Sequence, residues 1–292
     1  MKKVRILNDR NVGMGEIPFI IAEIGNNHNG SIDLAKKMIK ICKDMRVDAV
    51  KFQVKDIETA FSKELLDKPY EGSNSFGKTY REHKEALEFS EEQLKEIYDY
   101  SNKLGIICFA TPFDIKSVTI LERLNNPIYK ISSFHVTDLK LIEEVAKTSK
   151  PIIISTGMST INEIDKAMEI IRKYHDNVIM LQCTSCYPTE DKDINLNVIP
   201  YLREKYNCPI GYSGHEKGVG ITAACVALGA CMIERHFTLD RTMKGPDHAA
   251  SVEPTGMELI IKRARRVFVA LGNSEKTVLD SELLNRKKFR GY

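Results

Sequence analysis

The chain has 292 residues, of which 42% are hydrophobic and 28% charged, and its 43 basic and 40 acidic residues give a net charge of +3. This composition excludes collagen-like, disordered and coiled-coil chains, and the near-neutral charge argues against a nucleic-acid partner. No stretch approaches about eighteen uninterrupted apolar residues, and residues 1–10 lack the apolar core of a signal peptide. We therefore expect a cytoplasmic protein with no membrane partner.

Eight short apolar runs predict eight β-strands that alternate with amphipathic helices along the chain. In order, the runs are 18–24, 49–53, 106–110, 128–131, 152–155, 178–182, 209–211 and 231–234. Continuous apolar runs without strict alternation are typical of parallel strands covered on both faces. Eight strand–helix units of roughly 30 residues close naturally into a barrel, and no GxGxxG follows the first strand to support an open sheet. We therefore predict a (β/α)8 TIM barrel with a short N-terminal extension.

Helix starts are marked by capping residues. Ser31 is a candidate cap for the first helix, and the pairs Ser90 with Gln93 and Thr160 with Glu163 are typical of capping boxes.

Two segments interrupt the regular alternation of strands and helices. Residues 54–89 form a long polar insertion that we expect to fold near the site, and residues 281–292 are predicted to be a solvated basic tail. The predicted domain organisation is therefore a barrel domain at residues 1–280 and a tail at residues 281–292.

The cysteines do not predict a disulfide framework. Their number is seven, and most lie inside apolar runs, which is typical of reduced, buried thiols. Cys183 and Cys186 have CxxC spacing, which also occurs in redox and zinc sites. No second cysteine pair supports zinc, and the pair follows a strand rather than opening a helix. The reduced-thiol interpretation is therefore favoured.

Polar residues follow the predicted strands, and a barrel of this kind places its site at the carboxyl ends of the strands. Lys51 and Lys130, flanked by Gln53 and Ser133, predict an anion pocket, although a single lysine at a strand end can simply extend into solvent. His215 and His236 follow the seventh and eighth strands, which are neighbours in a closed barrel. Two imidazoles can hold a divalent metal, or can be hydrogen-bonded core residues.

Long motifs give a more specific indication. They are Ile21-Ala22-Glu23-Ile24-Gly25-Asn26-Asn27-His28-Asn29-Gly30, Val50-Lys51-Phe52-Gln53, Tyr129-Lys130-Ile131-Ser132-Ser133, Gly211-Tyr212-Ser213-Gly214-His215-Glu216 and Glu234-Arg235-His236-Phe237-Thr238-Leu239-Asp240. Over about residues 17–272, the chain resembles the sialic acid synthase family. Residues 77–83 resemble members that act on sialic acid precursors, including those that use a 6-phosphorylated sugar.

The resemblance implies a TIM-barrel enzyme that condenses phosphoenolpyruvate with an N-acylmannosamine-type sugar. The product would be N-acetylneuraminate or a legionaminic or pseudaminic relative. It implies a divalent metal on His215 and His236, manganese first, with magnesium or cobalt as alternatives. Phosphoenolpyruvate-binding positions correspond to Lys51, Thr111, Lys130, Ser133, Ser155 and Ser213, and sugar-binding positions to Asn74, Tyr187 and Asp247. Gln53 and Ser185 are further candidate substrate contacts, and Glu23 is the candidate carboxylate for stabilising positive charge in the reaction.

Two departures from the family pattern affect these expectations. His135 stands where the family has an acidic residue, and histidine can act as a base but supplies no fixed negative charge. Typical members also continue into a C-terminal antifreeze-like domain, whereas this sequence ends at Tyr292, near where the linker would begin. A homodimer formed by the barrels alone is therefore still possible. The alternatives are another phosphoenolpyruvate-dependent aldose synthase, or a catalytically weak barrel that binds a sugar or a partner.

Overall fold

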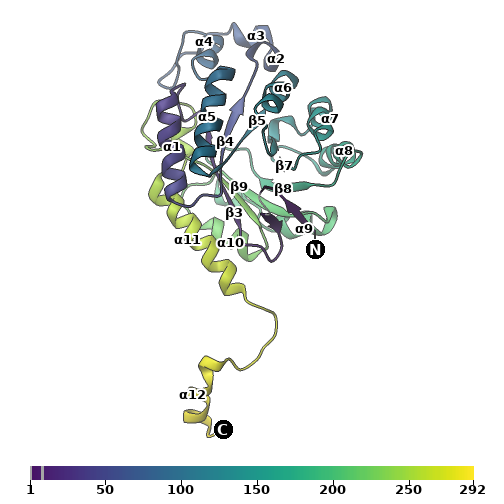
Figure 1. The fold of residues 1–292 in the computed structure, drawn as a ribbon, viewed down its shortest axis with the longest axis vertical. Coiled ribbons are helices and arrows are strands. Elements are labelled where there is room, and N and C mark those ends of the chain that lie inside the picture. The colour runs from purple at the N-terminus through teal and green to yellow at the C-terminus, as the bar shows by residue number, and fades with distance from the viewer. Residues whose placement is uncertain (1, 8–9) are drawn as a thin grey trace.

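A closed barrel of eight parallel strands forms the body of the molecule in the computed structural model, which describes residues 2–7 and 10–292 (Figure 1). Residues 1, 8 and 9, which belong to the N-terminal segment considered above, lie outside the described residues. The barrel order is β10-β3-β4-β5-β6-β7-β8-β9. The strands are β3 (Phe19–Gly25), β4 (Ala49–Val54), β5 (Ile107–Pro112), β6 (Tyr129–Ile131), β7 (Ile152–Ser155), β8 (Val178–Cys183), β9 (Ile210–Gly214) and β10 (Met232–His236). The predicted (β/α)8 barrel is therefore confirmed.

All eight predicted strands are present, and several extend further than the apolar runs. The run 209–211 belongs to a strand that continues to Gly214, and the run 231–234 belongs to one that continues to His236. Pairing persists there because polar residues at the ends of neighbouring strands remain in register, as Glu234 does with Ser213. Of the extra residues, Ser213 and His236 line the cavity at the mouth of the barrel.

Successive residues of each strand point alternately into the barrel and out toward the helices, so the strands contribute to two apolar clusters and, at their carboxyl ends, to one polar layer. Inward-facing residues such as Phe19, Ile21, Phe109 and Ile153 fill the barrel, and the residues between them pack against the surrounding helices. Continuing the inward positions toward the carboxyl ends gives a different set, namely Glu23, Lys51, Thr111, Lys130, Ser155, Ser213, Glu234 and His236. The period of two along each strand therefore brings these polar residues together at one end of the barrel.

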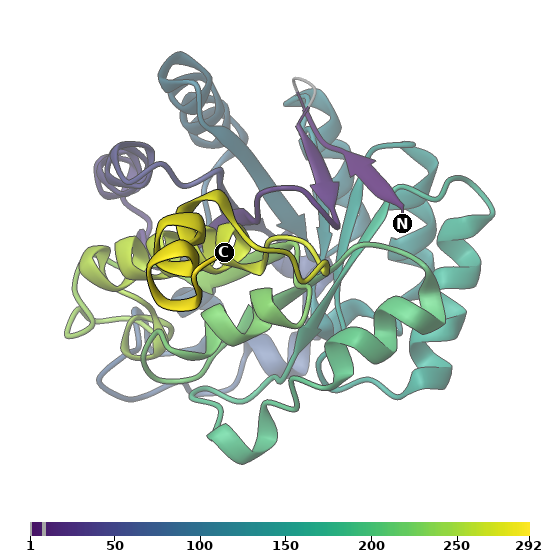
Figure 2. The same cartoon turned by 90° about the horizontal axis from the view of Figure 1, so that it is seen from below.

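The N-terminal extension closes the opposite end. Strands β1 (Lys3–Arg5) and β2 (Asn11–Gly13) form an antiparallel hairpin. Val4 and Val12 are fully buried and join the cluster inside the barrel. Figure 2 shows this hairpin from below, at the end of the barrel that lies away from α2–α4 (Figure 1).

Helices join the strands and begin where the sequence predicts. Ser31 accepts a hydrogen bond from Leu34 N, and both predicted capping boxes, at Ser90 and Thr160, are present. The helices between the strands are α1 (Ile32–Asp44), α5 (Glu91–Leu104), α6 (Ile115–Arg123), α7 (Leu139–Lys147), α8 (Ile161–Arg172), α9 (Val198–Tyr206) and α10 (Ile221–Ala227), and α11 (Pro254–Leu271) follows β10. None of the helices in the described part of the chain has the length and hydropathy required to cross a bilayer.

The two irregular segments both contain helices. The insertion after β4 folds into α2 (Ile57–Ala60), α3 (Lys63–Leu66) and α4 (Tyr80–Glu85), which lie over the carboxyl ends of the strands (Figure 1). At the other end, α12 (Asp280–Arg290) is exposed and lies apart from the barrel on an extended connection (Figure 1). The domain division at residue 280 stays a prediction. All seven cysteines are free thiols, and six are buried, with Cys186 exposed.

Candidate functional site

A cavity of about 580 Å³ opens at the carboxyl ends of the strands. It is lined by most of the predicted site residues, namely Glu23, Lys51, Gln53, Thr111, Lys130, Ser133, His135, Ser155, Tyr187, Ser213, His215, His236 and Asp247. Asn74 and Ser185 are not among its lining residues. The strands therefore bring together residues that are more than 200 positions apart in the sequence.

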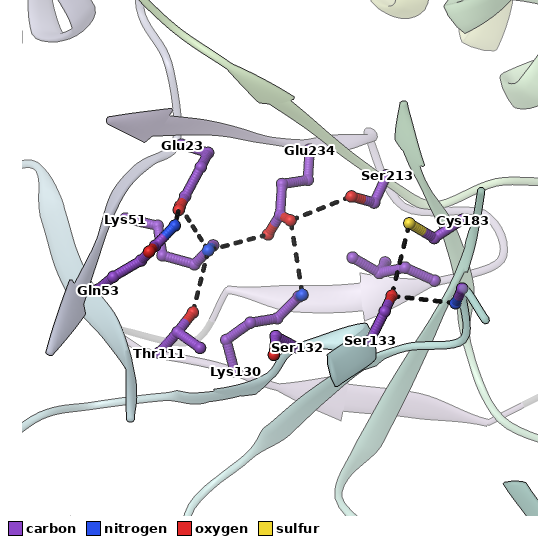
Figure 3. A network of polar contacts seen from close by, with 12 residues as sticks. Glu23, Lys51, Gln53, Thr111, Lys130, Ser132, Ser133, Cys183, Ser213 and Glu234 are labelled. Carbon is purple, nitrogen blue, oxygen red and sulfur yellow. Dashed lines mark hydrogen bonds and ion pairs between the residues drawn. The ribbon is translucent and has the colours of Figure 1, made fainter. Parts of the chain in front are cut away.

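Two lysines and two glutamates form a connected network at the inner end of this cavity (Figure 3). Lys51 makes an ion pair with Glu23, donates to Thr111 Oγ1 at 3.0 Å, and has its Nζ 3.8 Å from Glu234 Oε2. Lys130 Nζ lies 3.5 Å from Glu234 Oε1. Glu234 thus lies between both ammonium groups, and Ser213 Oγ donates to it at 3.1 Å.

The charges in this network are nearly excluded from water, because the side chains of Lys51 and Lys130 are each 4% exposed. Burial lowers the pKa of Lys130, and the carboxylate of Glu234 opposes that shift. Burial acts to raise the pKa of Glu234, but Lys130 and Lys51 outweigh it and hold that pKa below its usual range. The inner end therefore holds two cations and two anions. Both ammonium groups are already positioned before an anionic ligand binds.

Hydroxyl groups and backbone N–H groups complete this end. Gly157 N donates to Ser133 Oγ at 3.0 Å, and a Cβ at Gly157 would lie 2.3 Å from Ser185 Oγ, so only glycine allows this close approach. Ser155 Oγ and Ser185 Oγ are buried and have no hydrogen-bond partner in the described structure. Buried polar atoms without partners are uncommon, and Ser155, which lines the cavity, is free to bond a ligand oxygen.

His215 and His236 lie side by side, with ring centroids 5.5 Å apart, and both contact the ring of Tyr187. The Nδ1 of His215 lies 2.9 Å from the backbone oxygen of Thr184, so a proton on Nδ1 leaves the lone pair on Nε2. Nδ1 of His236 is buried without a partner. Burial lowers the pKa of both imidazoles and thereby favours the neutral form, which metals require.

These features fit a divalent metal that takes two imidazoles from the protein. Among the described residues there is no cluster of three or more His, Cys, Asp or Glu side chains suited to a metal. A site with two protein ligands leaves coordination positions for water and substrate oxygens. The residues present therefore suit a catalytic site better than a closed structural one.

His135 lies beside this network in a short 3₁₀ helix, Ser133–His135. Its Nδ1 is 2.8 Å from Ser132 Oγ, and its ring meets the edge of Phe113. Burial lowers its pKa, and the carboxylates of Asp138 and Asp114 oppose that shift. The imidazole is therefore neutral at neutral pH and able to accept a proton.

Asn74 contacts the loop that carries Asp247 rather than the cavity itself. Its Oδ1 accepts a hydrogen bond from Gly245 N at 3.4 Å. Asp247 lines the cavity, and its charge acts on both His236 and Lys84. Asp247 is therefore within electrostatic reach of both His236 and Lys84, and Asn74 contacts the loop that carries it.

Several lining residues were not among the predicted set. Glu234 occupies an inward position of β10 two residues before His236, so the alternation within that strand could have identified it. Lys55, Phe61, Tyr80 and Lys84 come from the insertion. Their irregular spacing in short helices and turns gives no periodic signal.

Comparison with known proteins decides the family. The NeuB family profile matches residues 38–276. Over 271 residues, the chain is 42% identical to the N-acetylneuraminate-9-phosphate synthase of Mus musculus, covering 92% of this chain and 76% of that protein. The chain belongs to the NeuB family.

Two further relatives of this NeuB-family chain extend the comparison. It is 38% identical to the N,N'-diacetyllegionaminic acid synthase of Campylobacter jejuni, covering 91% of this chain and 81% of that protein. The crystal structure of N-acetylneuraminic acid synthetase from Leptospira borgpetersenii, in complex with citrate, is 32% identical with a TM-score of 0.85. That comparison covers 100% of this chain and 98% of the other.

Proposed function

We propose that this chain condenses phosphoenolpyruvate with an N-acylmannosamine-type sugar, or its 6-phosphate, to give a sialic-acid-like nine-carbon 2-keto acid and inorganic phosphate. The observation that carries the proposal is one cavity in which paired lysines adjoin two neutral imidazoles. The lysines suit a substrate with carboxylate and phosphate groups, and the imidazoles suit a metal-assisted carbonyl reaction. The sialic and legionaminic acid synthases among its relatives support the same chemistry.

In the proposed reaction, the enol carbon of phosphoenolpyruvate attacks the aldehyde carbon of the open-chain sugar and forms the new C–C bond. Positive charge then develops at C2, and Glu23 is the carboxylate placed to stabilise it, with Gln53 Nε2 donating to its Oε1 at 3.0 Å. Water adds to C2, and the C–O bond to phosphate breaks. Lys51 and Lys130 hold the anionic groups throughout, assisted by Thr111, Ser133, Ser155 and Ser213.

His135 is our candidate for the base that takes the proton from this water. Its neutral ring lines the cavity, and the Ser132 hydroxyl next to Nδ1 fixes its orientation. A base of this kind replaces the acidic residue expected from the family pattern. Because burial lowers the pKa of His135, the reaction would lose its base only when the pH falls below the ordinary range of histidine.

His215 and His236 would hold the divalent metal, for which we propose manganese. Bound there, the ion supplies Lewis-acid polarisation of an acceptor oxygen. Asp247 and Tyr187 line the same part of the cavity and are the proposed contacts to the sugar, with Asn74 supporting the loop of Asp247 and Ser185 placed beside Gly157.

A legionaminate- or pseudaminate-type acceptor is the second candidate, and the 38% identity to a legionaminic acid synthase favours it. Both candidates share the phosphoenolpyruvate chemistry and differ in the sugar. A cytoplasmic location and a homodimer stay predictions.

The decisive experiment measures phosphate release from phosphoenolpyruvate with manganese and a panel of acceptors. The panel contains N-acetylmannosamine, its 6-phosphate, and the diacetamido sugars that lead to legionaminic and pseudaminic acids. We expect release that depends on one acceptor. In water labelled with ¹⁸O, the released phosphate should stay unlabelled, because water attacks carbon rather than phosphorus.

His215→Ala is the matched variant for this assay. We expect it to lose acceptor-dependent release and manganese affinity together, whereas His175→Ala, outside the cavity, retains both. If no acceptor in the panel causes phosphate release while manganese and phosphoenolpyruvate still bind, the synthase proposal is overturned in favour of a barrel that only binds its ligands. Unchanged manganese affinity in His215→Ala would remove that residue from the metal site.

A further inference from the structure

The insertion builds the outer wall of the cavity from aromatic rings and two lysines. Phe61 and Tyr80 pack edge-on, with ring centroids 5.5 Å apart, and Lys84 Nζ lies 5.6 Å and 4.9 Å from those two centroids. Lys55 Nζ lies 4.6 Å from the centroid of Phe113. All five side chains line the same cavity as the inner lysines.

The lysines of the cavity differ in their counter-ions. Lys51 and Lys130 face Glu23 and Glu234. Lys55 donates to Glu88 at 2.9 Å, which engages one of its three protons. The side chain of Lys84 makes neither a hydrogen bond nor an ion pair with any described residue, although it lines the cavity.

Burial lowers the pKa of Lys84, and the charges of Glu88 and Asp247 only partly oppose this effect. A partly buried ammonium group without a bonded anion is unfavourable, because it loses part of its water without gaining an ionic partner. An anionic ligand that reached Lys84 would therefore gain more than one that reached a lysine already paired.

Asp247 indicates which part of a substrate lies there. It lines the same cavity as His236 and Lys84, and its charge acts on both of them. A sugar with its aldehyde end at the histidines would place its middle hydroxyls near Asp247. Its far end would then lie toward Lys84 and Lys55.

We propose that Lys84, assisted by Lys55, binds a phosphate group at the far end of the acceptor, so that the preferred acceptor is a phosphorylated N-acyl sugar. This inference rests on the proposed function, because it assumes that the sugar occupies this cavity. A phosphate dianion fits the subsite because both lysines offer free N–H donors as point charges, with little demand on geometry. The rings of Phe61 and Tyr80 lie near the ammonium group of Lys84 and favour its position at this wall.

The test compares N-acetylmannosamine with its 6-phosphate, using Lys84→Gln, Lys84→Arg and the control Lys68→Gln. Lys68 belongs to the same insertion but is exposed, with its Nζ 3.6 Å from Glu64 on the surface. We expect the ratio of kcat/KM for the phosphorylated over the free sugar to fall by about 30-fold or more in Lys84→Gln. Lys84→Arg should restore much of that ratio, and Lys68→Gln should keep it.

Calorimetric binding of the sugar 6-phosphate separates this inference from the proposed function. Binding that is lost in Lys84→Gln but kept in Lys68→Gln supports the subsite even if no acceptor releases phosphate from phosphoenolpyruvate. An active wild-type enzyme that prefers the free sugar would overturn the subsite and leave the synthase intact. Equal loss of both sugars in Lys84→Gln would also overturn it, because the lysine would then serve only the shape of the wall.

Discussion

The inner and outer ends of the cavity are built from different kinds of structure. At the inner end, Lys51, Lys130 and Glu234 come from the barrel strands, and each cation faces a carboxylate. At the outer end, Phe61 and Lys84 come from short helices and turns of the insertion, and Lys84 lacks a bonded anion. The inner groups are thus positioned by the barrel itself, and the outer ones by a segment laid over it.

This difference suggests that the inner end carries out the reaction and the outer end selects the acceptor. A reaction that breaks and forms bonds needs groups held on rigid elements, which strands provide. Selection among acceptors requires a surface that can vary without disturbing the barrel, which loops provide. Changes at the inner end should therefore affect stability and phosphoenolpyruvate, and changes at the outer end should affect the choice of sugar.

The largest effect is expected from Glu234→Gln, which leaves two buried ammonium groups with less compensating charge. Removing one partner of a buried ion pair is strongly destabilising, and we expect a loss of about 3–5 kcal/mol in the free energy of unfolding, measured by urea denaturation. Glu190→Gln is the matched control, because Glu190 pairs with Lys192 at the surface and is 71% exposed. Equal stability of the two variants would show that the network contributes no more than a surface pair.

Lys130→Ala tests the inner end as an anion site. We expect it to weaken phosphoenolpyruvate binding by about 2–4 kcal/mol, because a buried charge-assisted contact is lost. Calorimetric titration with phosphoenolpyruvate measures this directly. Lys147→Ala, which removes an exposed ammonium group from α7, provides the comparison. Unchanged phosphoenolpyruvate affinity in Lys130→Ala would contradict the assignment of this lysine to the anion site.

The same division explains what could be predicted from the sequence. The barrel, its eight strands and the inner residues follow from apolar runs and from the polar residues at their ends, because a period of two fixes which side chains point inward. Glu234 could have been found by that rule. Lys84 could not, because no periodicity relates residues 54–89 to the cavity, and its placement depends on how Tyr80, Phe61 and the barrel mouth pack together.

His28 packs between Phe52 of the barrel and Phe89 of the insertion and should make stability depend on pH. It follows β3, stacks on Phe89 of the insertion with ring centroids 4.0 Å apart, and accepts a hydrogen bond from Gly30 N at Nδ1. Burial, aided by the charge of Lys55, lowers its pKa to about 3. The unfolded chain therefore binds a proton that the folded chain excludes, and stability falls as pH drops below about 6.5.

At pH 5 this linkage amounts to about 2 kcal/mol for the single group. Urea denaturation of the wild type and of His28→Asn between pH 7 and pH 5 measures it. Asparagine keeps an acceptor for Gly30 N but does not titrate, so the variant should lose less stability over this range. Parallel curves for the two proteins would assign the pH dependence to other groups.

The smallest effect is expected from Phe61→Leu, which keeps an apolar side chain but removes one of the two rings beside Lys84. A cation–π contact at a partly exposed site contributes about 0.5–1 kcal/mol, so KM for a phosphorylated acceptor should rise about two- to fivefold. Tyr201→Leu removes an exposed aromatic ring of α9 outside the cavity and serves as the control. A fall in KM would instead mean that the ring competes with the ligand for the ammonium group. The outer wall would then restrain Lys84 until a substrate arrives.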